Sequence, residues 1–295
     1  MKIGDWKASA ELNKIYGEAR ALGLETNLAE LEAFGFTVVE PEKLKAGDLF
    51  ERMLQSVHTI CAKLDAEGTP GNQLLGAKSD YTRMVHGLIG RDPLFAEAAM
   101  HPAALTLGRY LMGASCRLFT VTAFVKRGPA TSTLLHTDTL GTAPPLYPFG
   151  LTCNISWILT DYTEQNGTFA MVPGSHRYCR HPSDIEQPKI MGGSNDNICV
   201  PVEARPGSLI VFNGNTWHGS WPKNDESFRA HVVTAYCRNY IIPSENYDDA
   251  SPALIDKYGA DIAHLFARDT WQTYKTPQAA PDLVALRRAH VTPSA

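Results

Sequence analysis

The sequence has no pair of cysteines at the spacing of a zinc ribbon or a redox-active dithiol. Its 6 cysteines occur at irregular intervals without a C-x-x-C motif, so neither a zinc site of that kind nor a disulfide framework is indicated. A chain of 295 residues can bury a core without covalent staples, and scattered reduced thiols are typical of cytoplasmic proteins. The cysteines are Cys61, Cys116, Cys153, Cys179, Cys199 and Cys237.

Long apolar runs and basic stripes are also missing. No stretch approaches the roughly 18 consecutive apolar residues of a membrane span, and the opening residues MKIGDWKASAELNK lack the apolar core of a secretory signal. Charged residues make up 20% of the chain and leave a net charge of -4. We therefore expect a cytoplasmic protein with no membrane or nucleic-acid partner. Whether it is a monomer or a homodimer stays open.

Helical periodicity dominates residues 1–112. Between residues 44 and 64, apolar side chains recur at intervals of three and four, which is typical of an amphipathic helix. Residues 102–112 begin with a proline, which helices accept in their first turn. Asn27 is expected to cap a short helix. The expected helices span 7–22, 28–34, 44–64, 92–99 and 102–112, with a short strand at 36–40.

From Cys116 onward the pattern changes to short segments rich in β-branched and aromatic residues, separated by turns. Such a pattern predicts an all-β barrel or sandwich. We expect one domain over 1–295, with a helical N-terminal part at 1–112, a β-core at about 113–242 and a helical tail at 243–295. The expected strands lie in CRLFTVTAFVK, LTCNISWILTD, GTFAMVP, NICVPVEA, GSLIVFNG and AHVVTAYCRNYII.

His136 and Asp138 form the only H-x-D motif in the sequence. On a strand, residues i and i+2 point to the same side, so the two side chains can converge on one ion. An imidazole and a carboxylate with open coordination positions are the donors expected for non-haem iron(II) rather than for a closed structural zinc site. A lone H-x-D is a weak signal, because a surface histidine near an aspartate is common.

The segment NTWHGSW strengthens that signal. It places His218 directly after the apolar stretch SLIVF, and Arg229 follows eleven residues later. A guanidinium offers a fixed fork for a carboxylate, and Ser220 adds a hydroxyl beside it. His218 alone is readily a loop histidine, and Arg229 alone a solvated strand-edge charge. Together they form a coherent set for binding a metal and a dicarboxylic acid.

Four blocks in this order resemble the phytanoyl-CoA dioxygenase family of iron(II)/2-oxoglutarate oxygenases. They are LLHTDTL, WILTDYTEQNGTFAMVPGSHR, RPGSLIVFNGNTWHGSW and FRAHVVTAYC, and the similarity covers about residues 116–240. The resemblance implies a mainly β fold with flanking helices around a double-stranded β-helix, a cupin-like jelly roll. It also implies Fe(2+) as the metal, 2-oxoglutarate as cosubstrate and O2 as oxidant.

By motif position, the resemblance implies that His136, Asp138 and His218 bind the iron. It also implies that Arg229 and Ser220 hold the distal carboxylate of 2-oxoglutarate. The carboxylate of Asp138 matters for the reaction, because related halogenases have a small residue there. Hydroxylation is therefore favoured over halogenation.

Five further residues are candidates for the site. Trp157 is expected beside the cosubstrate, where the family has an aromatic residue. Thr137 stands between two ligands where the family often has Gln, so a hydrogen bond to the cosubstrate there would be altered or lost. Tyr147 and Phe149, in the loop after the H-x-D motif, and Trp221, after the distal histidine, are expected in an apolar substrate pocket. Ordinary packing explains these last three equally well.

The resemblance implies hydroxylation of a C–H bond in a small organic substrate, lipid-like or of natural-product type, with release of succinate and CO2. Desaturation, epoxidation and rearrangement are alternatives within the same class. A barrel metalloenzyme that does not use 2-oxoglutarate and a non-catalytic metal-binding jelly-roll module are alternatives outside it. Lys126 and Arg127 either meet an anionic group or are exposed charges at a strand end, which is the more common case.

Overall fold

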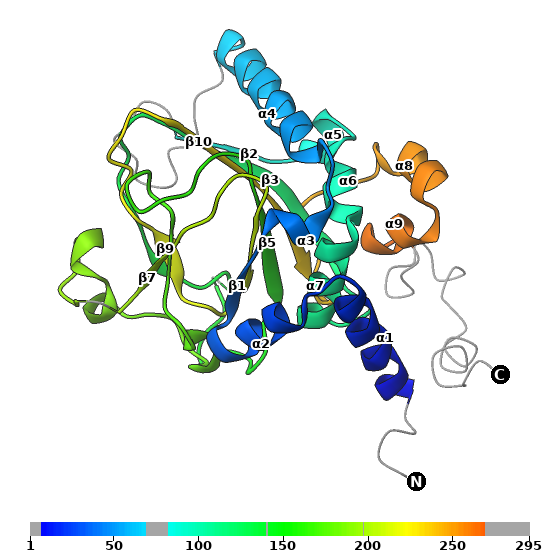
Figure 1. The fold of residues 1–295 in the computed structure, drawn as a ribbon, viewed down its shortest axis with the longest axis horizontal. Coiled ribbons are helices and arrows are strands. Elements are labelled where there is room, and N and C mark those ends of the chain that lie inside the picture. Colours follow the sequence, from blue (N-terminus) through cyan, green and yellow to red (C-terminus); the bar gives the residue numbers. More distant parts are fainter. Residues whose placement is uncertain (1–6, 69–81, 140, 197, 269–295) are drawn as a thin grey trace.

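The computed structural model describes residues 7–68, 82–139, 141–196 and 198–268, and shows two antiparallel β-sheets with helices gathered along one side (Figure 1). The expected fold class is confirmed: a mainly β protein with flanking helices around a core of the double-stranded β-helix type. Residues 269–295, which include part of the expected helical tail, lie outside the described residues.

The larger sheet has six strands in the order β1-β8-β5-β10-β3-β2. Its central strands are long and almost entirely buried, as their β-branched and aromatic residues predict. Strand β2 lies in the part of the chain expected to be helical, so that expectation was incomplete. The bounds are β1 Phe36–Val39, β2 Thr82–Val85, β3 Arg117–Arg127, β5 Thr152–Ile158, β8 Leu209–Asn213 and β10 Phe228–Cys237.

The smaller sheet has four short strands in the order β4-β9-β6-β7. Its strands β4 and β9 carry the two histidines of interest, and their register places His136 directly opposite His218. The bounds are β4 Thr133–His136, β6 Phe169–Met171, β7 Val200–Val202 and β9 His218–Ser220.

The helices lie close to their expected positions. Helix α7 begins at Pro102 as predicted, and the side chain of His101 accepts a hydrogen bond from the Ala103 amide at its N-terminus. No helix among the described residues is long and apolar enough to cross a membrane. The bounds are α1 Lys7–Ala21, α2 Glu25–Phe34, α3 Pro41–Leu44, α4 Leu49–Ala66, α5 Leu88–Arg91, α6 Phe95–Met100, α7 Pro102–Met112, α8 Ser251–Tyr258 and α9 Ala260–Leu265.

The expectation that Asn27 caps a helix was wrong. Helix α2 already begins at Glu25, and Asn27 is buried in its first turns. The Asn27 amide donates to Thr37 Oγ1 at 2.8 Å and to the Val38 carbonyl at 2.9 Å. The side chain therefore ties α2 to the following strand β1.

The two faces of the larger sheet serve different purposes. One face packs under helices α6 and α7, and Val121, Ala123 and Val125 of β3 are fully buried there. Because side chains alternate along a strand, the intervening residues of β3 point toward the smaller sheet. That second face forms one wall of a cavity.

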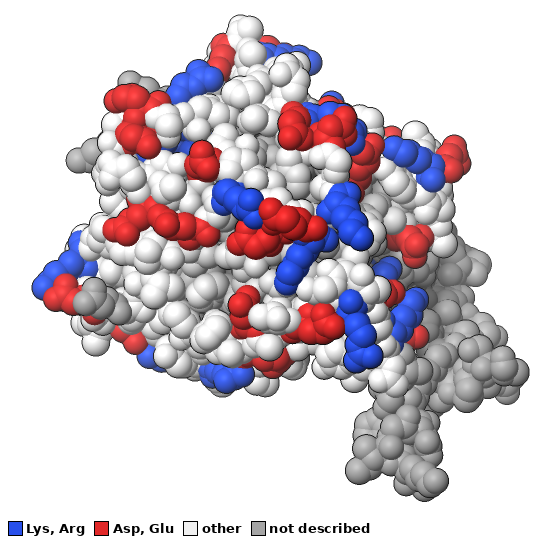
Figure 2. All heavy atoms as spheres, viewed as in Figure 1, with Lys and Arg blue, Asp and Glu red and all other residues white. Residues whose placement is uncertain are grey.

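Acidic and basic side chains are interspersed on the surface shown in Figure 2. Several form ion pairs, such as Arg52 with Glu97 at 2.8 Å and Arg205 with Glu40 at 3.1 Å. This face carries no continuous stripe of one sign. The absence of a nucleic-acid partner stays a prediction.

Candidate metal centre

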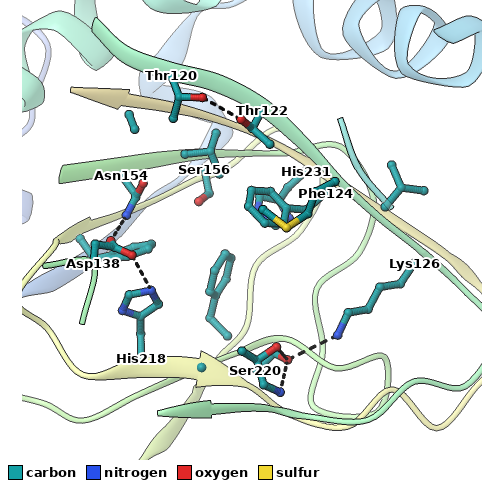
Figure 3. Close-up of a pocket in the computed structure, with 18 of the residues that line it drawn as sticks. Thr120, Thr122, Phe124, Lys126, Asp138, Asn154, Ser156, His218, Ser220 and His231 are labelled. Atoms are coloured by element: carbon teal, nitrogen blue, oxygen red, sulfur yellow. Dashed lines mark hydrogen bonds and ion pairs between the residues drawn. The ribbon is translucent and has the colours of Figure 1, made fainter. Parts of the chain in front are cut away.

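A cavity of about 310 Å³ lies between the two sheets. Asp138 and His218 stand at one side of it, and Lys126 and Ser220 at the other (Figure 3). Both sheets contribute to its walls: β3, β5 and β10 from the larger sheet, and β4, β6 and β9 from the smaller one. Most of the residues that line it are therefore positioned by strands, while Asp138 follows directly on the end of β4.

His136, Asp138 and His218 come together at one end of the cavity. One potential ligand atom from each lies within 4.8 Å of the others. The two imidazole rings are 4.3 Å apart between centroids, and His218 Nε2 lies 3.5 Å from Asp138 Oδ1. Two imidazoles and one carboxylate facing an open cavity form a donor set that suits non-haem iron(II).

The same local contact orients both imidazoles. His136 Nδ1 donates to the Leu134 carbonyl, and His218 Nδ1 donates to the Thr216 carbonyl, each at 2.9 Å. With Nδ1 engaged in this way, the lone pair on Nε2 is left for a metal. Burial lowers the pKa of His218 to about 4, with a smaller opposing effect of Asp138, so this imidazole is neutral near pH 7.

Asp138 lies just beyond the end of β4 rather than on the strand itself. Its amide donates to the Gly214 carbonyl at 2.8 Å, which brings the residue against the β8–β9 connection. The Asn154 amide donates to Asp138 Oδ2 and fixes the carboxylate. Asn154, on β5, was missed by the sequence analysis. Asn154 meets the H-x-D motif only because the two sheets face each other.

Arg229 and Ser220 both face the cavity, away from the His/Asp cluster. Arg229 is only 4% exposed, its guanidinium carbon lies 4.8 Å from the centre of the Tyr162 ring, and its Nε has no hydrogen-bond partner in the described part of the chain. Its Nη1 reaches the Asn166 carbonyl at 3.4 Å. Ser220 Oγ accepts from the Thr133 amide at 3.0 Å. A buried guanidinium with few hydrogen bonds has N–H donors available to bind a carboxylate.

Trp157 does not face the cavity, contrary to the expectation. It is fully buried on the helix-covered face of β5, where its ring lies 5.3 Å from that of Phe50. Its Nε1 donates to Thr234 Oγ1 at 3.1 Å. The residue that faces the cavity is its neighbour Ser156 (Figure 3), whose buried hydroxyl forms no hydrogen bond with any residue that the structure describes.

Thr137 and Trp221 also point away from the cavity. Each is the neighbour of a cavity-facing residue, so alternation turns it outward. Thr137 is fully buried and its hydroxyl contacts His181 Nδ1 at 2.9 Å. Trp221 packs with Trp217 on the outer side of the smaller sheet. Neither lines the cavity, so Thr137 is not placed to bind a cosubstrate there, and packing is the interpretation that fits Trp221.

Tyr147 and Phe149 do not line the cavity either. They are 52% and 44% exposed and stack on each other with centroids 5.5 Å apart. The Arg238 guanidinium carbon lies 4.4 Å from the Phe149 ring centre. Of the interpretations left open, surface packing is the one that fits these two residues.

Lys126 is the most informative residue whose position the sequence left open. It is 5% exposed and faces the cavity, whereas its neighbour Arg127 is exposed.

His231 was not recognised in the sequence analysis. It is fully enclosed between Phe124, whose ring stacks on it at 4.8 Å, and Tyr162, whose hydroxyl contacts its Nδ1. His231 lies two positions after Arg229 on β10, so alternation could have found it, whereas Lys126 is placed beside Arg229 only by the register of β3 and β10.

Comparison with known families agrees with this geometry. The family model described as "Phytanoyl-CoA dioxygenase (PhyH)" matches residues 31–230, more than half of the chain. The chain belongs to the phytanoyl-CoA dioxygenase family. The predicted enzyme class, a dioxygenase, is thereby confirmed at the level of the family.

Individual relatives are distant. The dioxygenase af480 of Aspergillus fumigatus is 26% identical over 235 residues, which cover 78% of this chain and 72% of that protein. Some other curated dioxygenases match over as little as 27% of their own length. Among solved structures, HygX from Streptomyces hygroscopicus, with nickel and 2-oxoglutarate bound, has a TM-score of 0.60 at 18% identity, covering 75% of this chain and 89% of that one. The nogalamycin epimerase SnoN, in complex with Fe3+ and alpha ketoglutarate, has a TM-score of 0.57 at 20% identity, covering 80% and 90%.

Proposed function

We propose that this protein is an iron(II)- and 2-oxoglutarate-dependent dioxygenase that hydroxylates a C–H bond of a small organic substrate. One observation carries the proposal. Two imidazoles and a carboxylate converge within 4.8 Å at one end of a cavity, and a buried guanidinium that pairs with no carboxylate of the described residues faces the same cavity. That combination suits a metal together with a ligand that carries a second, distant carboxylate.

His136, Asp138 and His218 would hold the iron through their Nε2 and carboxylate atoms. Arg229, with the hydroxyl of Ser220, would hold the distal carboxylate of 2-oxoglutarate. Iron and 2-oxoglutarate, when bound, supply the oxidising chemistry from O2, with succinate and CO2 as coproducts. The structures of HygX and SnoN, which hold 2-oxoglutarate or alpha ketoglutarate together with a metal, support this assignment by their shared fold.

The protein's own contribution is to bind, to orient and to exclude water. Phe212 packs its ring 4.5 Å from that of His218, and Phe169 continues this apolar wall. On the opposite side, Thr122 and Ser156 add hydroxyl groups. A cavity of about 310 Å³ with aromatic walls and a few polar groups is of the kind that takes a small molecule.

Succinate formation tests the proposal. Protein purified without oxygen is given iron(II), 2-oxoglutarate, ascorbate and air, with and without candidate substrates. We expect slow conversion of 2-oxoglutarate to succinate without substrate, because O2 can react at such a site even when no substrate is bound. We also expect its loss in Asp138→Ala, which removes one of the three metal donors. The matched control is Asp196→Ala, which removes an exposed carboxylate outside the cavity.

The negative outcomes separate the alternatives. Absence of succinate, together with no binding of 2-oxoglutarate to the metal-loaded protein, would contradict the proposal. Tight metal binding without turnover or 2-oxoglutarate binding would favour a non-catalytic metal-binding module. If succinate forms, the mass of the substrate product distinguishes hydroxylation from desaturation, epoxidation and rearrangement.

A further inference from the structure

Two buried cations stand side by side on the wall of the cavity. Lys126 of β3 and Arg229 of β10 are direct partners in the antiparallel register, so their side chains leave the sheet on the same face. Both face the cavity, and they are 5% and 4% exposed. Two buried positive charges on adjacent strands repel each other, and this repulsion destabilises the folded state unless a negative charge neutralises them.

No protein carboxylate does so among the described residues. Lys126 Nζ has only long contacts of 3.5 Å to Ser220 Oγ and to the Thr131 carbonyl (Figure 3). Arg229 reaches one carbonyl at 3.4 Å, and its Nε has no partner. The contacts around the two cations are therefore neutral and weak.

Other buried cations of this chain are treated differently. Lys223 is fully buried, and Asp225 forms an ion pair with it. Arg83 is 5% exposed and pairs with Asp65 at 2.5 Å. Arg83 also lines the cavity, so three of its lining residues are cationic, and among the described residues Lys126 and Arg229 are the two of these three without a carboxylate partner. A bound anionic ligand would supply the negative charge that these two side chains lack.

We propose that Lys126 is a second cationic anchor, which acts with Arg229 on the distal carboxylate of the 2-oxo acid and makes the site selective for dicarboxylic cosubstrates. This inference rests on the proposed function. Arg229 offers a planar fork and Lys126 a point charge from the neighbouring strand. Ser220, which contacts Lys126 Nζ and is fixed by the Thr133 amide, lies at the same place. A carboxylate there would meet two cations and a hydroxyl.

The role is one of selectivity, and two cosubstrate probes make it measurable. 2-Oxoglutarate and 2-oxopentanoate share the 2-oxo acid group, and 2-oxopentanoate lacks the distal carboxylate. Titration calorimetry without oxygen, on full-length protein loaded with Mn(II), gives the Kd of each. We expect Lys126→Met to weaken 2-oxoglutarate roughly 10- to 100-fold, which is the usual effect of losing a hydrogen bond to a charged group. Binding of 2-oxopentanoate should hardly change.

Two further variants make the result specific. Lys126→Arg keeps the charge, so it should retain most of the affinity for 2-oxoglutarate. Arg127→Met removes a positive charge one position away but outside the cavity, so it should leave both Kd values unchanged. Thermal unfolding of each variant confirms that the fold is intact.

Three results would overturn the inference. Lys126→Met could leave the Kd of 2-oxoglutarate unchanged, or it could weaken both probes equally, which indicates a structural role. Arg127→Met could match the effect of Lys126→Met, which indicates a general charge effect. A wild-type protein that binds metal but neither probe would instead contradict the proposed function itself, and this inference with it.

Discussion

Single residues orient the side chains of the proposed metal centre. His136 and His218 each donate from Nδ1 to the carbonyl two residues earlier in the chain, so both present Nε2 to the same space. Asn154 fixes the third donor by donating to Asp138 Oδ2. Such partners of metal ligands set ligand orientation and contribute to affinity.

Asn154→Ala should therefore weaken metal binding by roughly 10- to 100-fold while leaving all three donors in place. The reason is that the Asp138 carboxylate loses the group that orients it. Titration of the protein with Mn(II) or Co(II) measures the effect. Asn246→Ala, at an exposed asparagine outside the cavity, is the matched control. Equal metal affinity in the two variants would show that Asn154 does not support the site.

The affinity for 2-oxoglutarate should depend on pH through Lys126. Burial, reinforced by Arg229 and Lys223, lowers the pKa of Lys126 to about 7. A bound carboxylate favours the protonated amine, so the Kd should be lowest below pH 7 and should rise as the pH increases above 7. His231, also close to Arg229 and Lys126, has its pKa held well below its usual value by burial and stays neutral throughout. It therefore adds nothing to this rise.

Lys126→Arg tests that explanation, because arginine stays charged over the whole range. Calorimetric Kd values for 2-oxoglutarate between pH 6 and 9 should rise in the wild type and stay flat in the variant. A rise of the same size in both would assign the pH dependence to another group.

At the scale of residues, the sequence singled out the residues that the structure brings together as a candidate metal site, and it missed their surroundings. His136, Asp138, His218 and Arg229 lie in motifs, so spacing and residue type were enough to select them. Asn154 carries no motif and meets Asp138 only because two sheets face each other. Lys126 was recognised as a cation, but its burial depends on which face of β3 forms the cavity wall.

At the scale of elements, a glycine lets the two histidine-bearing strands approach closely. Gly219 lies between His218 and Ser220 on β9, opposite β4. A Cβ atom at this position would lie 2.3 Å from the Thr133 carbonyl oxygen and 3.0 Å from that of Leu134. Both are backbone atoms, so the strands would have to separate.

Gly219→Ala should accordingly lower the melting temperature and weaken metal binding together, because His136 and His218 would move apart. Gly17→Ala is the matched control. That glycine lies in α1 with nothing within 4 Å of its Cβ position, and alanine favours a helix by about 1 kcal/mol. Normal metal affinity in Gly219→Ala would contradict the claim that this close approach sets the site.

The positions of most strands could be predicted from composition. Which face of a strand points into the cavity could not. Strand β5 is buried on both faces, since helices cover one and the cavity lies under the other. Its pattern therefore does not show whether Trp157 or Ser156 faces the ligand. Alternation alone does exclude Thr137 and Trp221 once His136 and Ser220 are placed in the cavity. Sequence proximity to a ligand was a poor guide to the pocket.

At the scale of the whole molecule, the site joins the two sheets. The proposed metal donors His136 and His218 come from the smaller sheet, and Arg229 comes from the larger one. A ligand that spans this distance therefore stabilises the contact between sheets. Ligands that bind only the folded state raise its stability by mass action, by about 2.7 kcal/mol at 100 times the Kd.

Metal and 2-oxoglutarate together should thus raise the melting temperature by roughly 5–10 °C for a chain of this size. Mn(II) replaces iron in this thermal unfolding assay to prevent turnover. Arg229→Ala should keep the part of the shift due to the metal and lose the part due to 2-oxoglutarate. An unaltered 2-oxoglutarate shift in that variant would place the cosubstrate elsewhere.

The most direct test of the account is the anaerobic addition of 2-oxoglutarate to iron(II)-loaded protein, followed by visible absorption. Chelation of iron(II) by a 2-oxo acid produces a charge-transfer band, so the account predicts a band that saturates at one 2-oxoglutarate per chain. The double variant His136→Ala/Asp138→Ala should show no band. Failure of the wild type to form the band, or an equal band in the double variant, would contradict a metal centre built from His136, Asp138 and His218.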